Sequence, residues 1–154
     1  MKPVRVAVDV PRPREEVYDF LDVMANHQTF NDHFMVDWQL SGPARGVGSR
    51  ARVRARAAGG DVVDIHTVSA SAPAAIAEEN VGAGGRRHGT GTYTLEELPG
   101  GGTRVLFEYA WRRAPLSERM AAPLVRAYMR RQLTESMRRL ADHLGAADPA
   151  GAAT

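Results

Sequence analysis

The middle of this chain contains six consecutive segments with the pattern of β-strands, and this run constrains the fold most strongly. Apolar and polar residues alternate within each segment, which is the period of two expected for half-buried strands. Short clusters of glycine, proline and aspartate separate the segments, most clearly at Pro99–Gly102. Strands joined by turns this short pair antiparallel. The predicted strands are residues 36–40, 50–57, 62–71, 75–81, 90–98 and 103–112.

One further strand and one or two helices are predicted before these six, and one long helix after them. Residues 4–10 alternate valine with other side chains, which is typical of a strand. Residues 17–24 place apolar side chains at helical spacing, and residues 26–34 could add a short second helix or a turn. After Pro115 the period becomes helical, and the buried stripe of the last helix is Val125, Met129, Leu133, Met137, Leu140 and Leu144. The predicted order is β-α-α-β6-α.

This order defines an α+β fold in which one helix covers a curved antiparallel sheet. A single helix is about 10 Å wide, so it cannot fill the concave face of seven strands. We therefore expect an internal cavity between the sheet and the helix. Residues 1–145 are predicted to form one domain, and residues 146–154, which are small and polar, a disordered tail.

The charge and composition exclude several classes of protein. Lys and Arg total 20 and Asp and Glu 18, and the bases are not gathered with aromatic residues, so we expect no binding to nucleic acid. The regular arginines of residues 50–56 predict a solvated outer face more strongly than a surface for an acidic partner or a membrane. No apolar run approaches the roughly 20 residues of a membrane span. The chain has no cysteine and no secretory signal pattern at residues 1–5, so we expect a cytoplasmic protein.

Several turn and core motifs occur in an order that resembles one known superfamily. They are the run from Val8 to Leu21, Gly42-Pro43 followed by Gly46-Val47-Gly48, and Gly91 to Leu95 leading into the last strand. Together with the last helix they resemble the START/Bet v 1-like (SRPBCC) superfamily, in particular its bacterial polyketide cyclase/dehydrase and lipid-transport group. The resemblance covers residues 3–145. It implies a helix-grip fold with an internal pocket, but it carries no catalytic residue over to this chain.

Members of that superfamily bind lipids, sterols, quinones, polyketides or hormones, and some catalyse cyclisation, aromatisation or dehydration. The resemblance therefore implies either a carrier of a small, largely apolar molecule or an enzyme that uses the same cavity. A third reading is an interaction module that dimerises through an exposed sheet edge. No cofactor is implied.

The cavity should be lined by inward-facing strand residues and by residues near its mouth. In the last two strands the inward residues would be Tyr93, Leu95, Val105, Phe107, Tyr109 and Trp111, although such aromatic side chains often do no more than fill a core. The predicted lining is His27, Phe30, His33, Trp38, Val53, His66, Glu78, His88, Tyr93, Phe107, Tyr109, Trp111, Val125 and Met129.

The candidates for acid–base chemistry are Tyr109, His66 and Glu78. Glu78 and Glu79 are adjacent on a strand, so only one can face inward, and Glu78 shares a side with Ile76. A histidine such as His33, His66 or His88 could transfer protons, although a surface or hydrogen-bonded histidine is the commoner case. No histidines have the spacing of a metal motif, so no metal site is predicted.

Overall fold

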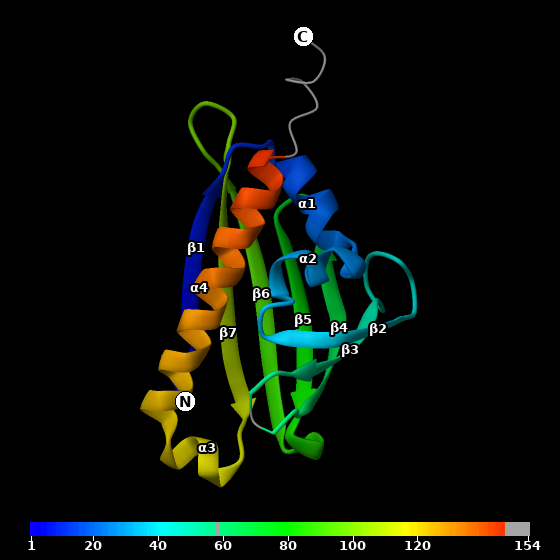
Figure 1. Ribbon diagram of the computed structural model, residues 1–154. Helices are drawn as coiled ribbons and strands as arrows, with labels where there is room; N and C mark the ends of the chain where they lie inside the picture. The colour runs from blue at the N-terminus through cyan, green and yellow to red at the C-terminus, as the bar shows by residue number, and fades with distance from the viewer. Residues whose placement is uncertain (58, 147–154) are drawn as a thin grey trace.

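Seven strands form one antiparallel sheet whose concave face is covered by the long helix α4 (Figure 1). The computed structural model describes residues 1–57 and 59–146. The strands are β1 (Val4–Val10), β2 (Met35–Ser41), β3 (Arg50–Ala55), β4 (Val62–Ser71), β5 (Ala75–Gly82), β6 (Arg87–Glu97) and β7 (Thr103–Arg113). The helices are α1 (Arg14–Asp22), α2 (His27–Asn31), α3 (Leu116–Met120) and α4 (Ala122–Ala146), with short 3-10 turns η1 (Met24–Asn26) and η2 (Ala83–Gly85).

The strand order is β1-β7-β6-β5-β4-β3-β2. Consecutive strands therefore pair from β2 to β7, and β1 pairs with β7 at the opposite edge of the sheet from β2. The hairpin β6–β7 pairs Leu95 with Val105, and β1 adds Val8 opposite Val105. Leu95 and Val105 are buried because alternate residues of these strands face the helix. The predicted α+β helix-grip fold, with its seven antiparallel strands and C-terminal helix, is confirmed.

Helix α4 packs tightly on the sheet only through its C-terminal half. Leu133, Met137, Leu140 and Leu144 are buried in the main core, as their spacing predicted. Helices α1 and α2 lie beside this half of α4 (Figure 1). The N-terminal half carries Val125 and Met129 on the same face, but these side chains are only partly buried. The N-terminal half of α4 therefore leaves space between itself and the sheet.

The helical region after Pro115 is divided into two helices. Backbone angles at Ala121 (φ −99°, ψ 23°) interrupt it between α3 and α4. Pro123 then lies in the first turn of α4, where its missing N–H leaves no hydrogen bond unmade. Helix α3 buries none of its side chains. Helix α4 continues to Ala146, whereas residues 147–154 of the predicted tail lie outside the described residues.

The arginines of β3 lie on the outer face of the sheet, where carboxylates of neighbouring strands pair with them. Arg52 Nε donates to Asp64 Oδ1 at 2.8 Å, and Arg54 Nε donates to Asp37 Oδ2 at 3.1 Å. These exposed pairs match the reading of residues 50–56 as a solvated face. None of the helices described in residues 1–57 and 59–146 is both long and apolar enough to span a bilayer.

Candidate functional site

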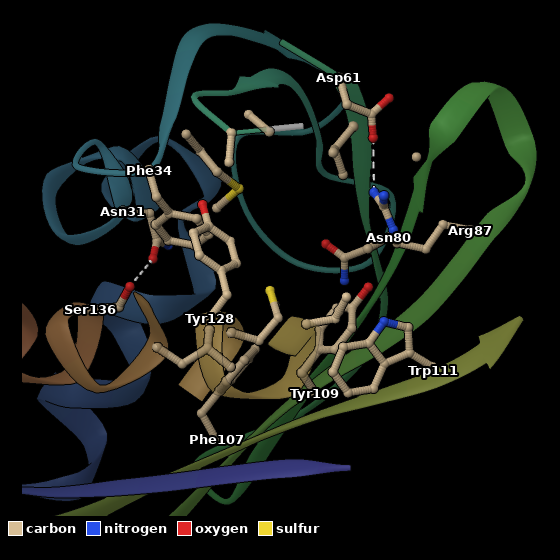
Figure 2. Close-up of a pocket in the computed structure, with 18 of the residues that line it drawn as sticks. Asn31, Phe34, Asp61, Asn80, Arg87, Phe107, Tyr109, Trp111, Tyr128 and Ser136 are labelled. Atoms are coloured by element: carbon tan, nitrogen blue, oxygen red, sulfur yellow. Dashed lines mark hydrogen bonds and ion pairs between the residues drawn. The ribbon is translucent and has the colours of Figure 1, made fainter. Parts of the chain in front are cut away.

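A cavity of about 390 Å³ lies between the sheet and the N-terminal half of α4 (Figure 2). Its walls are largely apolar. Strand β7 contributes Phe107, Tyr109 and Trp111, and α4 contributes Val125, Met129 and Leu133. Tyr109 and Trp111 meet edge to face, with ring centroids 4.9 Å apart (Figure 2). A cavity of this size and character suits a small organic molecule.

Two inward-facing glycines of β6 leave room for the aromatic wall. A Cβ atom at Gly89 would lie 2.2 Å from the Tyr109 hydroxyl oxygen, and one at Gly91 would lie 2.9 Å from Phe107 Cζ. Both distances are too short for non-bonded atoms. The rings of β7 can therefore lie across β6 only because these two positions have no side chain.

A polar group of two side chains interrupts the apolar wall, and we call Glu78 and Asn80 the polar pole. They lie two residues apart on β5, so both face the cavity. Glu78 is 5% exposed. Glu78 Oε2 and Asn80 Nδ2 are fully covered by neighbouring atoms, and neither makes a hydrogen bond of ordinary length. Burial raises the pKa of Glu78 to about 7, against the smaller opposing effect of a longer side-chain hydrogen bond from Asn80.

His27 lies directly behind Glu78, and its ring is fixed by the backbone. His27 Nε2 is 2.7 Å from the carbonyl oxygen of Leu21, which can only accept, so Nε2 carries the proton. The other nitrogen, Nδ1, is 3.8 Å from Glu78 Oε2. Burial lowers the pKa of His27. His27 therefore stays neutral at pH 7 and gives Glu78 no positive charge to pair with.

A second buried network joins α4 to α2 at the edge of the cavity. Ser136 Oγ donates to Asn31 Oδ1 at 2.7 Å (Figure 2), and the Asn31 side chain also hydrogen-bonds to Tyr93. Burial raises the pKa of Tyr93 well above its ordinary value, so its hydroxyl stays protonated. This network holds the buried half of α4 against α2.

An ion-paired cluster borders the cavity beside α3. Arg87 Nη1 donates to Asp61 Oδ2 at 2.8 Å, and Arg87 Nε donates to both carboxylate oxygens of Glu118 at 3.0 Å (Figure 2 shows the Arg87–Asp61 pair). Asp61 also accepts the backbone N–H of Ala83. Hydrogen bonds to Glu118 and Asp61 raise the pKa of Arg87 further, so the guanidinium is permanently charged and fully engaged.

Seven of the predicted lining residues border this cavity: Glu78, Tyr93, Phe107, Tyr109, Trp111, Val125 and Met129. The structure places the other seven elsewhere: His27, Phe30, His33, Trp38, Val53, His66 and His88. Among residues that bear on the cavity without a sequence prediction are Asn31, Asn80, Ser136, Asp61, Arg87 and Glu118. Asn80 could have been found from its place two residues after Glu78, and Ser136 from its position within the apolar stripe of α4.

Strand alternation explains the position of His66. Its neighbours Ile65 and Thr67 are buried, so His66 points to the outer face, where Arg50 and Glu79 are its cross-strand partners. His88 is likewise exposed, and its Nε2 bonds to the carbonyl oxygen of Gly85.

The other predicted lining residues are engaged in packing. His33 Nε2 donates to the carbonyl oxygen of Gln132, which ties the turn after α2 to α4. Phe30 is buried in the main core. Val53 belongs to a smaller cluster with Met24, Ala51 and Ile65, and Trp38 packs against that cluster. Within residues 1–57 and 59–146, no three His, Asp or Glu side chains come together in a way that could hold a metal ion.

A sheet gripping one C-terminal helix above a cavity defines the helix-grip architecture of START-like proteins. Residues 1–145 match the family model described as polyketide cyclase/dehydrase and lipid transport. The chain belongs to that family. A search of curated proteins finds no match.

Solved structures support the fold. A START superfamily protein from Mycobacterium smegmatis aligns with a TM-score of 0.73 at 12% identity, over 95% of this chain and 99% of that one. The protein TTHA0849 from Thermus thermophilus aligns at 0.71 with 18% identity, over 96% and 99%. DynU16, from the dynemicin biosynthetic locus, aligns at 0.67 with 21% identity over 97% of this chain, which spans only 49% of DynU16. At these identities the likeness concerns the fold.

Proposed function

We propose that this protein binds a small, largely apolar ligand in the cavity between the sheet and α4. The observation that carries the proposal is the cavity of about 390 Å³ with its aromatic and aliphatic walls. Removing apolar ligand surface from water would drive binding, at roughly 25 cal/mol per Å² before the costs of association. Membership of a family described by cyclisation, dehydration and lipid transport supports the same class of ligand.

The neutral fluorophore N-phenyl-1-naphthylamine tests this proposal, because its emission rises in apolar surroundings. We expect saturable binding to the wild type. Val63 lines the cavity, so Val63→Phe should fill part of it and weaken binding about tenfold. Val62→Phe is the matched control, since Val62 is 41% exposed and lies outside the cavity lining. Circular dichroism would check that both variants fold. No binding to the wild type, or equal binding to Val63→Phe, would contradict the proposal.

A second candidate is a cyclase, aromatase or dehydratase that uses the same cavity as an active site. The buried carboxyl group of Glu78 favours it, because this side chain lines the cavity and a carboxyl with a pKa of about 7 can both give and take protons near neutral pH. Tyr109 would be a second proton donor. Candidate polyketide-like substrates should be assayed with the wild type, Glu78→Gln and Tyr109→Phe. His66→Ala, on the outer face, becomes the control. Absence of turnover by the wild type would count against this candidate.

The cytoplasmic location and a possible homodimer stay predictions. The first is supported by the absence of cysteine from the sequence. The second would use an edge strand, β1 or β2, and a monomer in analytical ultracentrifugation would contradict it.

A further inference from the structure

Four large apolar side chains are exposed at one end of the molecule, and we call them the apolar end. They lie on α3 and on the start of α4, at the lower end of the protein in Figure 1. The exposed fractions are 67% for Leu116, 79% for Met120, 76% for Leu124 and 37% for Tyr128. Each helix carries two of them four residues apart, on one face. Single exposed apolar side chains are ordinary, but a group of them marks a docking surface.

Arginines without ion-pair partners accompany the apolar end. Residues 112–131 contain six arginines and one acidic residue, Glu118, so their net charge is +5. The net charge of the whole chain is +2, so the remaining residues carry −3. In the described part of the chain, no carboxylate pairs with Arg113, Arg119 or Arg131. The positive charge of this protein is therefore concentrated in the same segment as its exposed apolar side chains.

We propose that the apolar end docks on the surface of an anionic lipid bilayer. Its four side chains would enter the boundary between the lipid headgroups and the acyl chains, and the arginines would pair with lipid phosphates. Such a contact needs exposed apolar side chains flanked by positive charge, and residues 112–131 supply both. This inference goes beyond the proposed function, because a bilayer could bind the apolar end even if the cavity took no ligand.

The charge and shape of this surface favour a bilayer over two other occupants. A second copy of the chain would bring two segments of net charge +5 together, and like charges repel. An acidic protein would satisfy the arginines, but it would also need a groove shaped to receive α3, which buries none of its own side chains. A fluid bilayer receives an exposed helix without a matching groove.

Docking at this end would also bring the cavity to the lipid. Leu124 and Tyr128 line the cavity as well as being exposed, and Glu118 of α3 lines it too. These side chains lie between the cavity and the docked surface. An apolar molecule could therefore pass between the bilayer and the cavity with little of its surface exposed to water.

Co-sedimentation with large unilamellar vesicles tests the proposal. Vesicles of equal parts phosphatidylglycerol and phosphatidylcholine are anionic, whereas vesicles of phosphatidylcholine alone are not. We expect the wild type to bind the anionic vesicles at least about tenfold more tightly. Raising sodium chloride from about 0.1 M to about 0.5 M should weaken that binding about tenfold, because salt screens the arginines.

Apolar variants test whether α3 enters the bilayer. The double variant Leu116→Ser, Met120→Ser should bind the anionic vesicles about tenfold more weakly, because it removes two apolar side chains from the contact. Its fold should persist, since α3 buries no side chain, and circular dichroism would check this. Leu40→Ser is the matched control, because Leu40 is 52% exposed on β2, and it should bind as the wild type does.

Charge variants test the arginines. The double variant Arg113→Gln, Arg119→Gln should bind the anionic vesicles at least about tenfold more weakly, since each basic residue near such a surface contributes several-fold. The control Arg52→Gln, Arg104→Gln removes the same charge from two arginines that carboxylates already pair, and it should reduce the affinity much less.

The outcomes separate this inference from its alternatives. Absence of vesicle binding by a monomeric wild type would overturn it and leave an acidic protein as the occupant. Equal binding by the wild type and the Leu116→Ser, Met120→Ser variant would also overturn it. So would a wild-type dimer that the same variant converts to a monomer in analytical ultracentrifugation, which would assign the surface to a second copy.

The docking surface and the cavity can be tested independently. Leu116 and Met120 do not line the cavity. Without vesicles, the Leu116→Ser, Met120→Ser variant should therefore bind N-phenyl-1-naphthylamine as the wild type does. If no protein binds the fluorophore but the wild type binds anionic vesicles, the proposed function fails and the docking surface stands.

Discussion

Glu78 is buried beside the neutral ring of His27 and has no cation to pair with, and its behaviour with pH follows from that environment. Burial raises its pKa from 4.5 to about 7, so the folded protein holds this proton over a pH range in which the unfolded chain has lost it. Stability from this group is therefore present at low pH and decreases as the pH rises from about 4.5 through 7. The direction is opposite to that of a salt-bridged carboxylate.

Replacing Glu78 should remove this loss of stability. Urea denaturation would measure the free energy of unfolding of Glu78→Gln and of the wild type. Between pH 4.5 and pH 8 the difference between the two should shift by about 3 kcal/mol in favour of the variant, as a pKa shift of this size implies. Glu79→Gln, whose side chain is exposed, should follow the wild type over the same range. Parallel pH profiles for the wild type and Glu78→Gln would mean that Glu78 ionises freely in the folded protein.

For single residues, the sequence predicted which way a side chain points more successfully than it predicted the contacts of that side chain. Strand alternation was sufficient to choose Glu78 over Glu79 as the inward residue. It could not reveal that Asn80 and His27 lie beside Glu78, because that depends on how the strands and helices pack. His66 shows the limit of the same reasoning, since its neighbours Ile65 and Thr67 are the buried residues.

At the scale of elements, helix α3 is held in place by little besides one ion pair. Leu116 is 67% exposed and Met120 is 79% exposed. In the described part of the chain, the only polar side-chain contact from α3 to the sheet runs from Glu118 to Arg87. Both residues line the cavity. Movement of α3 would therefore open a route to the cavity, and we expect the Glu118–Arg87 ion pair to limit how often this happens.

Weakening this ion pair should expose the cavity more often. The chain has no cysteine, so Met129→Cys would place a single thiol in the cavity wall. Adding Glu118→Gln to this variant should speed labelling of the thiol several-fold, because a neutral amide binds Arg87 less strongly than a carboxylate does. Both side chains of this pair are only 18% exposed, so global stability should also fall, by about 1–3 kcal/mol, and urea denaturation measures that part separately.

Glu108→Gln is the control for that experiment, since it breaks the exposed Arg5–Glu108 pair on the outer part of the sheet. It should leave the labelling rate unchanged. Equal labelling in Glu118→Gln and its parent would show that α3 does not limit access.

The sequence predicted each strand and the long helix, because alternation and the turn residues act locally. It did not predict α3 as a separate helix. Leu116 and Met120 have the i, i+4 spacing of one helix face, so the sequence pattern does not separate residues 116–120 from the start of the long helix. The apolar stripe of α4 was predicted, but its unequal burial depends on where α2 meets the helix through Ser136 and Asn31.

At the scale of the whole molecule, the cavity makes stability depend on the ligand. A ligand that binds only the folded state stabilises it by about 2.7 kcal/mol at a concentration of 100 times its Kd. For a chain of 154 residues this should raise the Tm by roughly 5–10 °C. Scanning calorimetry with N-phenyl-1-naphthylamine would measure the shift.

Val63→Phe should show a much smaller rise in Tm at the same concentration of the fluorophore, because less of the cavity remains. An equal rise in this variant and in the wild type would place the binding site elsewhere on the protein.

The existence of a cavity could be predicted from size alone, since one helix is too narrow for seven strands. The position of the cavity could not be predicted, because it depends on α4 packing closely on the sheet only from Leu133 onward. The sequence also left ligand binding and catalysis as alternatives, and the description of the family names both cyclisation or dehydration and lipid transport.

The glycines of β6 have one further consequence. The interior volume opposite Tyr109 and Phe107 exists because two positions on the neighbouring strand carry only hydrogen. A change to alanine at Gly89 or Gly91 would put a methyl group where the Tyr109 or Phe107 ring now lies, so the ring would have to move into the cavity while the hydrogen-bonding pattern of the strand persists. In related chains, the size of molecule accepted could therefore evolve one methyl group at a time on a strand whose backbone stays the same.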